Sequence, residues 1–131
     1  MRIGVDFGGT KIEAAALDAS GAFAARIREQ NPGSYDAAIR LVAELVARVE
    51  AEVGPAQSVG LAIPGSPSPR TGLIRNANST YLNSRRFGDD LEAALCRPVR
   101  LANDANCLAL SEAADGAGAG AASLFGVILG T

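Results

Sequence analysis

The 131-residue sequence contains no histidine and no tryptophan, and it has only two cysteines, Cys96 and Cys107. Without histidine, these cysteines have no imidazole partner for a metal site, and their spacing fits no metal-binding motif. Both lie in apolar helical surroundings, where a cysteine is typically a buried, unreactive thiol. The sequence therefore predicts ordinary buried thiols and favours a reducing, cytoplasmic location.

The sequence also has neither a large net charge nor a long apolar run. The chain has 12 basic and 14 acidic residues, so no basic surface for a nucleic acid is predicted. Arginines do gather between residues 70 and 100, but acidic residues lie among them, which favours a solvated surface. No apolar run approaches the roughly 18 residues of a membrane span, and the first residues are expected to form a strand rather than a signal peptide. Neither a nucleic acid nor a membrane is therefore expected as a partner.

The length suffices for one domain with a real core, although it is short for an enzyme that encloses two substrates. Hydrophobic periodicity predicts strands over residues 2–5, 11–17, 23–28, 58–63, 99–102 and 124–129, and helices over residues 35–53, 87–95 and 105–114. Their order, βββαβαβαβ, indicates an α/β domain whose mixed sheet is covered by helices. The apolar runs 58–63 and 99–102 are typical of strands buried on both faces. The polar segment 70–84 is expected to be irregular, with short extended pieces at Leu73-Ile74 and Tyr81-Leu82, and a surface loop is the simplest interpretation of it.

The stretch from Gly4 to Lys11 carries the clearest functional pattern, because a short strand runs into Asp6, two glycines, a hydroxyl and a cation. Backbone N–H groups of Gly8 and Gly9 can approach a phosphate closely, since no Cβ blocks them, and Gly9 in particular is expected at such a point. Thr10 and Lys11 add a donor and a positive charge, and Asp6 is suited to the hydrated Mg²⁺ of a nucleotide. A plain Gly-Gly hairpin with a solvated Asp6 explains the same residues equally well.

Two further features fall at the ends of expected strands, where α/β folds bind ligands. Pro64-Gly65 follows the strand 58–63, and Asn103-Asp104 follows the strand 99–102. A carboxylate beside an amide at a strand–helix junction can accept a proton from a hydroxyl group that the amide orients. A helix N-cap explains Asn103-Asp104 without any catalytic role, and the two roles do not exclude each other.

Together these motifs resemble the N-terminal lobe of sugar kinases of the ROK family (repressor, open reading frame, kinase), and within it the bacterial fructokinases, also called manno(fructo)kinases. The matching segments are Asp6-Phe7-Gly8-Gly9-Thr10-Lys11, Gly60-Leu61-Ala62-Ile63-Pro64-Gly65 and Leu101-Ala102-Asn103-Asp104-Ala105-Asn106-Cys107. The segments resembling fructokinases in particular are Gly65–Pro69, Asn76–Thr80 and Leu82-Asn83. The matches are ordered, correctly spaced and spread over the whole chain.

The resemblance implies an actin-like, ribonuclease-H-like ATPase lobe and the ATP-dependent phosphorylation of a hexose, with fructose favoured and fructose 6-phosphate as product. Asp104 would be the catalytic base that accepts the proton of the attacking sugar hydroxyl. The residues expected to hold the sugar are Gly65, Asn78, Asn103 and Asp104. Those expected to face the phosphates of ATP are Gly8, Gly9, Thr10 and Lys11, with Asp6 binding Mg²⁺ through water.

The last residues, Ile128-Leu129-Gly130-Thr131, resemble the start of a second phosphate motif, which in the family continues into a second lobe. That lobe would carry further sugar contacts and a His/Cys₃ zinc site, so zinc is expected only there. Residues 1–131 are accordingly interpreted as one lobe of a two-lobe kinase whose second lobe is absent, and a homo-oligomer, a dimer, is expected.

Two other functions stay open. A sugar-responsive transcriptional repressor of the same family would carry a helix-turn-helix before the Asp-x-Gly-Gly-Thr motif, which here begins at Asp6. Repressors also often lose the kinase motifs, whereas Asp6, Lys11 and Asp104 are all present. A stand-alone sugar- or nucleotide-binding module is the third possibility.

Overall fold

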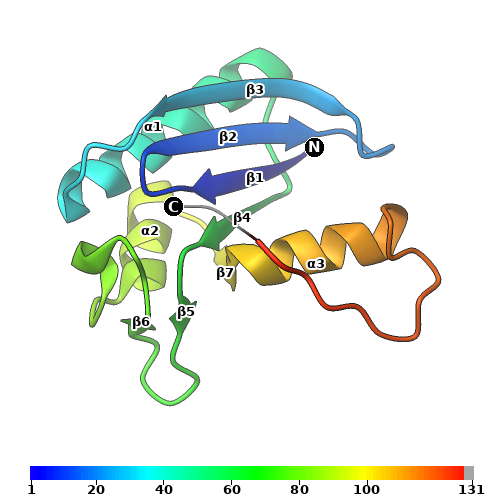
Figure 1. Cartoon of the computed structure of the whole chain (residues 1–131). Coiled ribbons are helices and arrows are strands. Elements are labelled where there is room, and N and C mark those ends of the chain that lie inside the picture. Colours follow the sequence, from blue (N-terminus) through cyan, green and yellow to red (C-terminus); the bar gives the residue numbers. More distant parts are fainter. Residues whose placement is uncertain (129–131) are drawn as a thin grey trace.

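The computed structural model describes residues 1–128 and has the expected α/β architecture, built on a five-stranded mixed sheet (Figure 1). The strands of this sheet are β1 (Arg2–Phe7), β2 (Lys11–Leu17), β3 (Phe23–Gln30), β4 (Ser58–Ile63) and β7 (Val99–Asn103). They lie in the order β3-β2-β1-β4-β7. The first three form an antiparallel meander, whereas β4 runs parallel to both β1 and β7. The carboxyl ends of β1, β4 and β7 therefore meet at one edge of the sheet.

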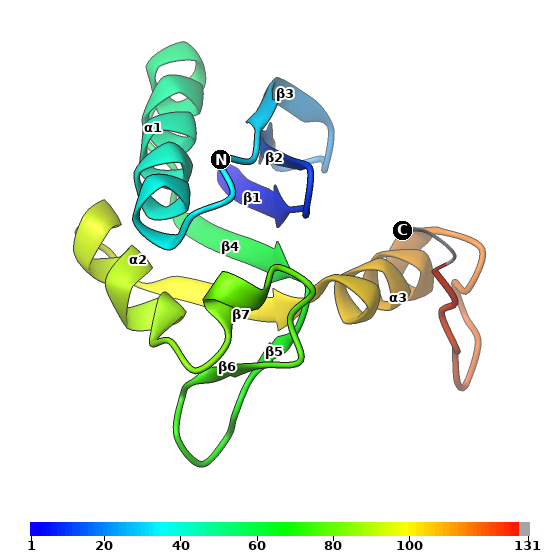
Figure 2. The ribbon, with the colours of Figure 1, turned by 60° about the vertical axis from the view of Figure 1, so that its left-hand side comes forward.

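Helices α1 (Tyr35–Val53) and α2 (Phe87–Leu95) cover one face of the sheet (Figure 2). The strands bury alternate side chains against them, because successive residues of a strand point to opposite faces. In β1, for example, Ile3, Val5 and Phe7 are buried while Asp6 is exposed. The ring of Phe7 meets that of Phe87 edge-on, with centroids 5.3 Å apart. The core thus lies between this face and the two helices.

The boundaries of α1 agree with the sequence prediction. Its buried side chains recur every three or four residues from Tyr35 to Val49, as an amphipathic helix requires. Gly54 follows the last turn with φ 85°, and its N–H donates to the Glu50 carbonyl at 2.8 Å. A left-handed φ is inexpensive only for glycine, which explains why the helix ends there.

The segment 70–84 is more ordered and more buried than the surface loop that its polarity predicts; the extended piece expected at Leu73-Ile74 overlaps a strand, whereas Tyr81-Leu82 is helical. It contains the short strand β6 (Ile74–Arg75), which pairs with β5 (Ser66–Pro67), and the 3₁₀ helix η1 (Thr80–Leu82). Ile74 and Leu82 are 2% and 0% exposed and belong to the same buried cluster as the side chains of the sheet. A few apolar residues within the polar stretch are therefore enough to fix the segment against the core.

The expectation that β4 and β7 are buried on both faces is also wrong. β4 alternates between buried and half-buried residues, and β7 between half-buried and exposed ones. Helices α1 and α2 cover only one face, while α3 (Asp104–Asp115) extends away from the end of β7 and has no buried residue (Figure 2). The same arrangement leaves Cys107 half-buried, and Cys96 is exposed at the end of α2, so the predicted buried thiols are not found.

The last expected strand, over residues 124–129, does not form within the described residues, and its final residue lies outside them, as does the Leu129–Thr131 part of the expected second phosphate motif. Residues 123–128 run beside α3 without a strand assignment, and a Cβ on Gly126 would lie 3.4 Å from the Cβ of Ala109. No strand of the described fold pairs with this segment. No helix in the described part of the chain has both the length and the apolar character needed to cross a membrane.

Candidate functional site

A cavity of about 560 Å³ lies at the edge of the sheet where β1, β4 and β7 end. It is lined by Asp6, Gly8, Gly9, Ala62, Pro64, Asn78, Asp104, Cys107, Leu108 and Ile128. Motifs that are up to 98 residues apart in the sequence, at Asp6 and Asp104, are thus brought to one place. This is the position at which parallel α/β sheets bind their ligands.

Five of the nine residues that the sequence assigns to a site line this cavity; they are Asp6, Gly8, Gly9, Asn78 and Asp104. Thr10 and Lys11 belong to the same turn as the two glycines but are exposed outside the lining. Asn103 and Gly65 contact each other, because the Asn103 Nδ2 donates to the Gly65 carbonyl at 3.1 Å. Neither is among the residues that line the cavity, and their hydrogen bond joins the turn after β4 to the start of α3.

The two glycines of the turn differ in their surroundings. The Gly8 N–H donates to the Lys11 carbonyl at 2.9 Å, and a Cβ on Gly8 would lie only 2.7 Å from that oxygen. A Cβ on Gly9 would meet no protein atom within 4 Å, and the φ of Gly9 is not positive. Within the protein, a Cβ is thus excluded at Gly8 but not at Gly9, which presents open backbone to the cavity. The close approach of a phosphate to Gly9 stays a prediction.

Gly65 is a second position where a side chain would not fit. Its φ is 145°, and a Cβ would lie 2.7 Å from the Arg75 carbonyl oxygen and 3.0 Å from the Ala77 nitrogen. The Pro64-Gly65 turn can therefore press against the segment 75–77 only because residue 65 is glycine. This close approach places Asn78, the next residue along that segment, at the cavity.

Asp104 begins α3, and the preceding Asn103 caps the helix as the sequence predicts. The Asn103 Oδ1 accepts a hydrogen bond from the Asn106 N–H at 3.3 Å, and Asp104 Oδ1 accepts one from its neighbour Ala105 at 2.8 Å. One helical turn further on, Cys107 also lines the cavity, and partial burial together with the nearby Asp104 and Asp6 raises the pKa of its thiol. Sequence reasoning missed Cys107, although its i+3 spacing from Asp104 places both on one face of α3.

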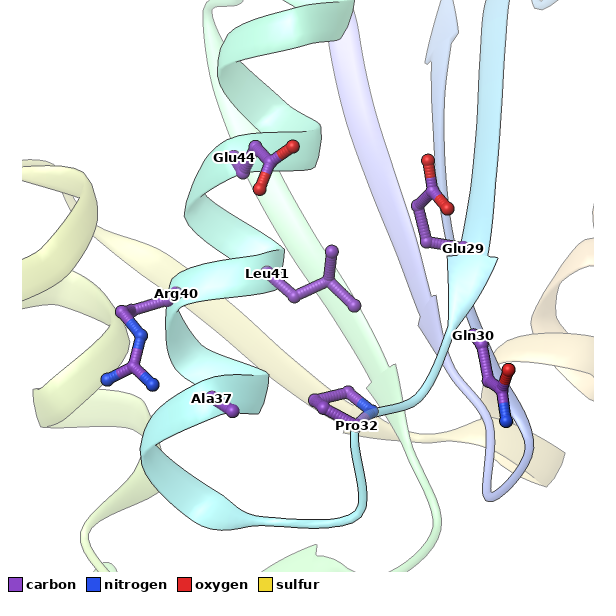
Figure 3. Close-up of a pocket in the computed structure, with 7 residues that line it drawn as sticks. All are labelled: Glu29, Gln30, Pro32, Ala37, Arg40, Leu41 and Glu44. Carbon is purple, nitrogen blue, oxygen red and sulfur yellow. The ribbon is translucent and has the colours of Figure 1, made fainter.

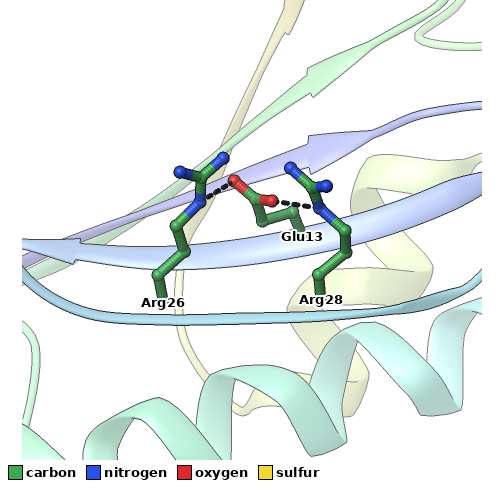
Figure 4. Close-up of polar contacts among 3 residues, drawn as sticks. All are labelled: Glu13, Arg26 and Arg28. Carbon is green, nitrogen blue, oxygen red and sulfur yellow. Dashed lines mark hydrogen bonds and ion pairs between the residues drawn. The ribbon is translucent and has the colours of Figure 1, made fainter.

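Charged residues lie side by side on three neighbouring strands, beginning with Asp6 on β1. The antiparallel register places Asp6 opposite Glu13, and Glu13 opposite Arg28. The Glu13 carboxylate is held by two guanidinium groups, those of Arg26 (Nε to Oε1, 2.6 Å) and Arg28, on the face away from α1 (Figure 4). These ion pairs, that with Arg26 above all, lower the pKa of Glu13.

The pKa of Asp6 is raised. Partial desolvation at the cavity is the largest cause, followed by the negative charges of Glu13 and Asp104, and the charge of Arg28 opposes them. In the described part of the chain, no three Asp, Glu or Cys side chains form a group that could hold a metal ion. Mg²⁺ at nucleotide sites commonly needs only one or two carboxylates, with phosphate oxygens and water as its other ligands. The Asp6 and Asp104 carboxylates at one cavity fit that requirement.

A second cavity, of about 480 Å³, lies between the end of β3 and α1 (Figure 3). It is lined by Glu29, Gln30, Pro32, Ala37, Arg40, Leu41 and Glu44. Glu29 and Glu44 both pair with Arg48, at 2.9 and 3.5 Å, so their charges are already compensated. None of the motif residues reaches it, and the cavity at the ends of β1, β4 and β7 remains the candidate site.

Comparison with known proteins agrees with this architecture. The profile of the ROK family matches residues 2–131. The N-acetyl-D-glucosamine kinase of Escherichia coli O127:H6 is 42% identical over 132 aligned positions, which cover 100% of this chain and 44% of the relative. The chain thus spans less than half the length of this curated relative.

Solved structures share the fold. A ROK hexokinase from Thermus thermophilus superposes with a TM-score of 0.78 and 34% identity, over 90% of this chain and 40% of its own. A ROK glucokinase from Streptomyces griseus, solved with glucose and AMPPNP, also gives 0.78, with 29% identity over 91% of this chain and 38% of its own. The mixed sheet with its helices is therefore the actin-like ATPase fold of these kinases, and the chain belongs to the ROK family.

Proposed function

We propose that this chain forms one lobe of an ATP-dependent hexose kinase and that its cavity at the ends of β1, β4 and β7 is the site of phosphoryl transfer. The observation that carries the proposal is the meeting of three elements in one cavity. They are a carboxylate at a helix N-terminus (Asp104), an amide on a loop (Asn78) and the open backbone of Gly9 in the Gly8-Gly9 turn. A hydroxyl substrate and a phosphate donor require this combination.

In this proposal Asp104 accepts the proton of the attacking sugar hydroxyl. Its position is fixed because it opens α3, where Asn103 caps the first turn and also holds the Gly65 carbonyl. Asn78 orients the sugar from the opposite loop. The Gly8-Gly9 turn receives the phosphates through the open backbone of Gly9, with Thr10 and Lys11 beside it. Phosphoryl transfer asks a protein mainly for such positioning and for charge stabilisation. Mg²⁺, held through water by Asp6, would neutralise phosphate charge when bound.

The identity of the hexose is a separate and more specific part of the proposal. The segments Gly65–Pro69 and Asn76–Thr80 resemble fructokinases, which supports fructose as the acceptor. N-acetylglucosamine and glucose are the main competitors, since the proteins to which this chain is similar include an N-acetyl-D-glucosamine kinase and a glucokinase. Comparing kcat/KM for fructose, glucose, mannose and N-acetylglucosamine in the complete protein decides between them. A higher kcat/KM for any other sugar than for fructose would overturn the fructose assignment.

The role of Asp104 is tested by Asp104→Asn in the complete protein. The change keeps the size of the side chain and an oxygen that can accept from the Ala105 N–H, but it removes the basic carboxylate, so kcat should fall by at least about 10²–10⁴-fold while sugar affinity changes little. Asp89→Asn is the matched control, because Asp89 is an exposed carboxylate on α2 that pairs only with Arg86 among the described residues. An Asp104→Asn protein with more than half the parental kcat would refute the assignment.

A ROK repressor or a simple binding module would give a different pattern. Either would bind sugar, or nucleotide, measurably by calorimetry while the complete protein with Asp104 intact turned over no sugar with ATP. The presence of Asp6, Lys11 and Asp104 together favours the kinase.

A further inference from the structure

Asn31, in the connection between β3 and α1, is a buried polar residue that binds the Gly-Gly turn at two points. Its exposed fraction is only 8%. The Asn31 backbone N–H donates to the Thr10 carbonyl at 2.8 Å, and its Nδ2 donates to the Gly8 carbonyl at 2.8 Å. One residue outside the motif thus anchors both sides of the turn that we propose for phosphate binding.

The other end of the same amide faces a different loop. The Asn31 Oδ1 accepts hydrogen bonds from the Tyr81 hydroxyl at 2.8 Å and from the Gly33 N–H at 2.9 Å. The orientation of the amide is determined by these partners, because the Gly33 N–H can only donate and the Gly8 carbonyl can only accept. Tyr81 is therefore the donor, and Asn31 bridges it to Gly8.

Tyr81 belongs to the loop that carries Asn78. Asn83 closes this loop on itself, since its Oδ1 accepts from the Ala77 N–H at 2.9 Å and its Nδ2 donates to the Ala77 carbonyl at 3.1 Å. Leu82, beside Tyr81, is fully buried and fixes the loop in the core. The position of Asn78 is thus coupled to that of Tyr81 through a short, hydrogen-bonded segment.

We infer that Asn31 and Tyr81 are positioning residues. Their hydrogen bond fixes the Gly8-Gly9 turn, proposed to bind phosphate, relative to the loop that carries Asn78, proposed to bind the sugar. The inference rests on the proposed kinase function. Neither residue lines the cavity, so neither is expected to touch a ligand. Without this hydrogen bond the turn and the loop are no longer held together. Each ligand must then order the segment that binds it, and this ordering lowers the affinity.

The two tyrosines of the chain provide a matched pair of variants. Tyr81→Phe removes only the hydroxyl that reaches Asn31, whereas Tyr35→Phe removes a hydroxyl that donates to Asp90 between α1 and α2. In the complete protein, Tyr81→Phe should raise the KM for both ATP and sugar about three- to tenfold, the effect of one neutral hydrogen bond, with kcat changed less. Tyr35→Phe should leave both KM values unchanged.

Asn31→Ala should raise both KM values further, and adding Tyr81→Phe to it should have no additional effect, because the bond is already absent. Hydrogen exchange in the 131-residue chain gives a second readout that requires no activity. The Gly8 N–H, which bonds within the turn, should exchange at least about threefold faster in Tyr81→Phe and at the parental rate in Tyr35→Phe.

Each outcome has a distinct meaning. The parental protein could phosphorylate a sugar while Tyr81→Phe has both KM values within twofold of parental and an unchanged exchange rate of the Gly8 N–H. In that case the inference is wrong and the kinase proposal stands. A parental protein without turnover would refute the kinase proposal, and the exchange rates would still decide whether Tyr81 positions the turn. Equal loss of melting temperature in both tyrosine variants, with unchanged KM values, would assign Tyr81 a structural role only.

Discussion

Asp6 and Glu13 lie directly opposite each other on β1 and β2, on the sheet face that α1 and α2 leave uncovered. Two carboxylates in such a pair repel each other. Arg26 and Arg28 bind Glu13 and lower its pKa, which keeps it charged. The pKa of Asp6 is raised, first by partial desolvation and next by the negative charge of Glu13. A residue of the candidate site is therefore tuned by a neighbour that lies outside the cavity lining.

The first prediction concerns this pair. Glu13→Gln removes a negative charge beside Asp6 and leaves Arg28 free to act on it, so the pKa of Asp6 should fall towards its ordinary value. Carboxyl ¹³C chemical shifts followed over pH measure it directly. Glu29→Gln is the control, since Glu29 also lies on a strand of the meander but pairs with Arg48 instead. An unchanged or higher pKa of Asp6 in Glu13→Gln would contradict the electrostatic account.

The second prediction separates the two glycines of the turn. Gly8→Ala places a Cβ 2.7 Å from a backbone oxygen, so the turn must shift, and we expect a loss of about 1–3 kcal/mol in the free energy of unfolding. Gly9→Ala meets no protein atom and should keep parental stability, yet it should raise the KM for ATP because Gly9 lines the cavity. Urea denaturation and steady-state kinetics measure the two effects. Gly9→Ala with parental ATP kinetics would favour the plain hairpin.

The third prediction concerns the ion pair between Glu50, near the end of α1, and Arg97, after α2. The two terminal guanidinium nitrogens of Arg97, Nη1 and Nη2, donate to the Glu50 carboxylate at 2.7 and 3.1 Å, and the Ala56 N–H donates to the same carboxylate at 2.8 Å. Glu50→Gln should lower the free energy of unfolding by about 1 kcal/mol at neutral pH. Glu52→Gln, on the same helix but exposed, should have little effect.

The pH dependence of this effect has a definite sign. The pKa of Glu50 is lowered below its ordinary value of 4.5, chiefly by the hydrogen bond from Arg97. The stabilisation is therefore complete above about pH 4.5 and is lost as the pH falls through the lower pKa of the folded state. Denaturation curves at several pH values should show the parental protein and Glu50→Gln converging in acid. A difference that grows towards acid would refute this assignment.

The fourth prediction concerns self-association of the 131-residue chain. Leu110, Phe125 and Val127, on α3 and the segment beside it, are 73%, 90% and 64% exposed. Exposed apolar side chains in one region tend to bind another chain, so concentrated protein should form dimers or larger species in light scattering. The double variant Leu110→Asp/Phe125→Asp should shift the protein towards monomer, while Phe23→Asp, at a phenylalanine on β3 that is 68% exposed, should not. A parental chain that is monomeric at high concentration would contradict the prediction.

The sequence alone determined the elements whose signals are local. The bounds of α1 follow from apolar spacing and from Gly54, and these act within a few residues of one another. The position of the candidate site followed as well, because parallel strands must bring their carboxyl ends, and hence Asp6 and Asp104, to one edge of the sheet.

The tertiary structure alone decided the features that depend on contacts between distant segments. For Ile74 and Leu82 the sequence predicts only short extended pieces within a polar segment, and the core beneath them makes their burial favourable. Residues 124–128 have the composition of a strand but no neighbouring strand within the described fold to supply hydrogen bonds. Asn31 and Tyr81, 50 residues apart, carry no motif, and their bond exists because folding brings two separate loops to the same turn. Periodicity reports which face of an element is apolar, whereas the partner of that face is decided by the packing of the whole chain.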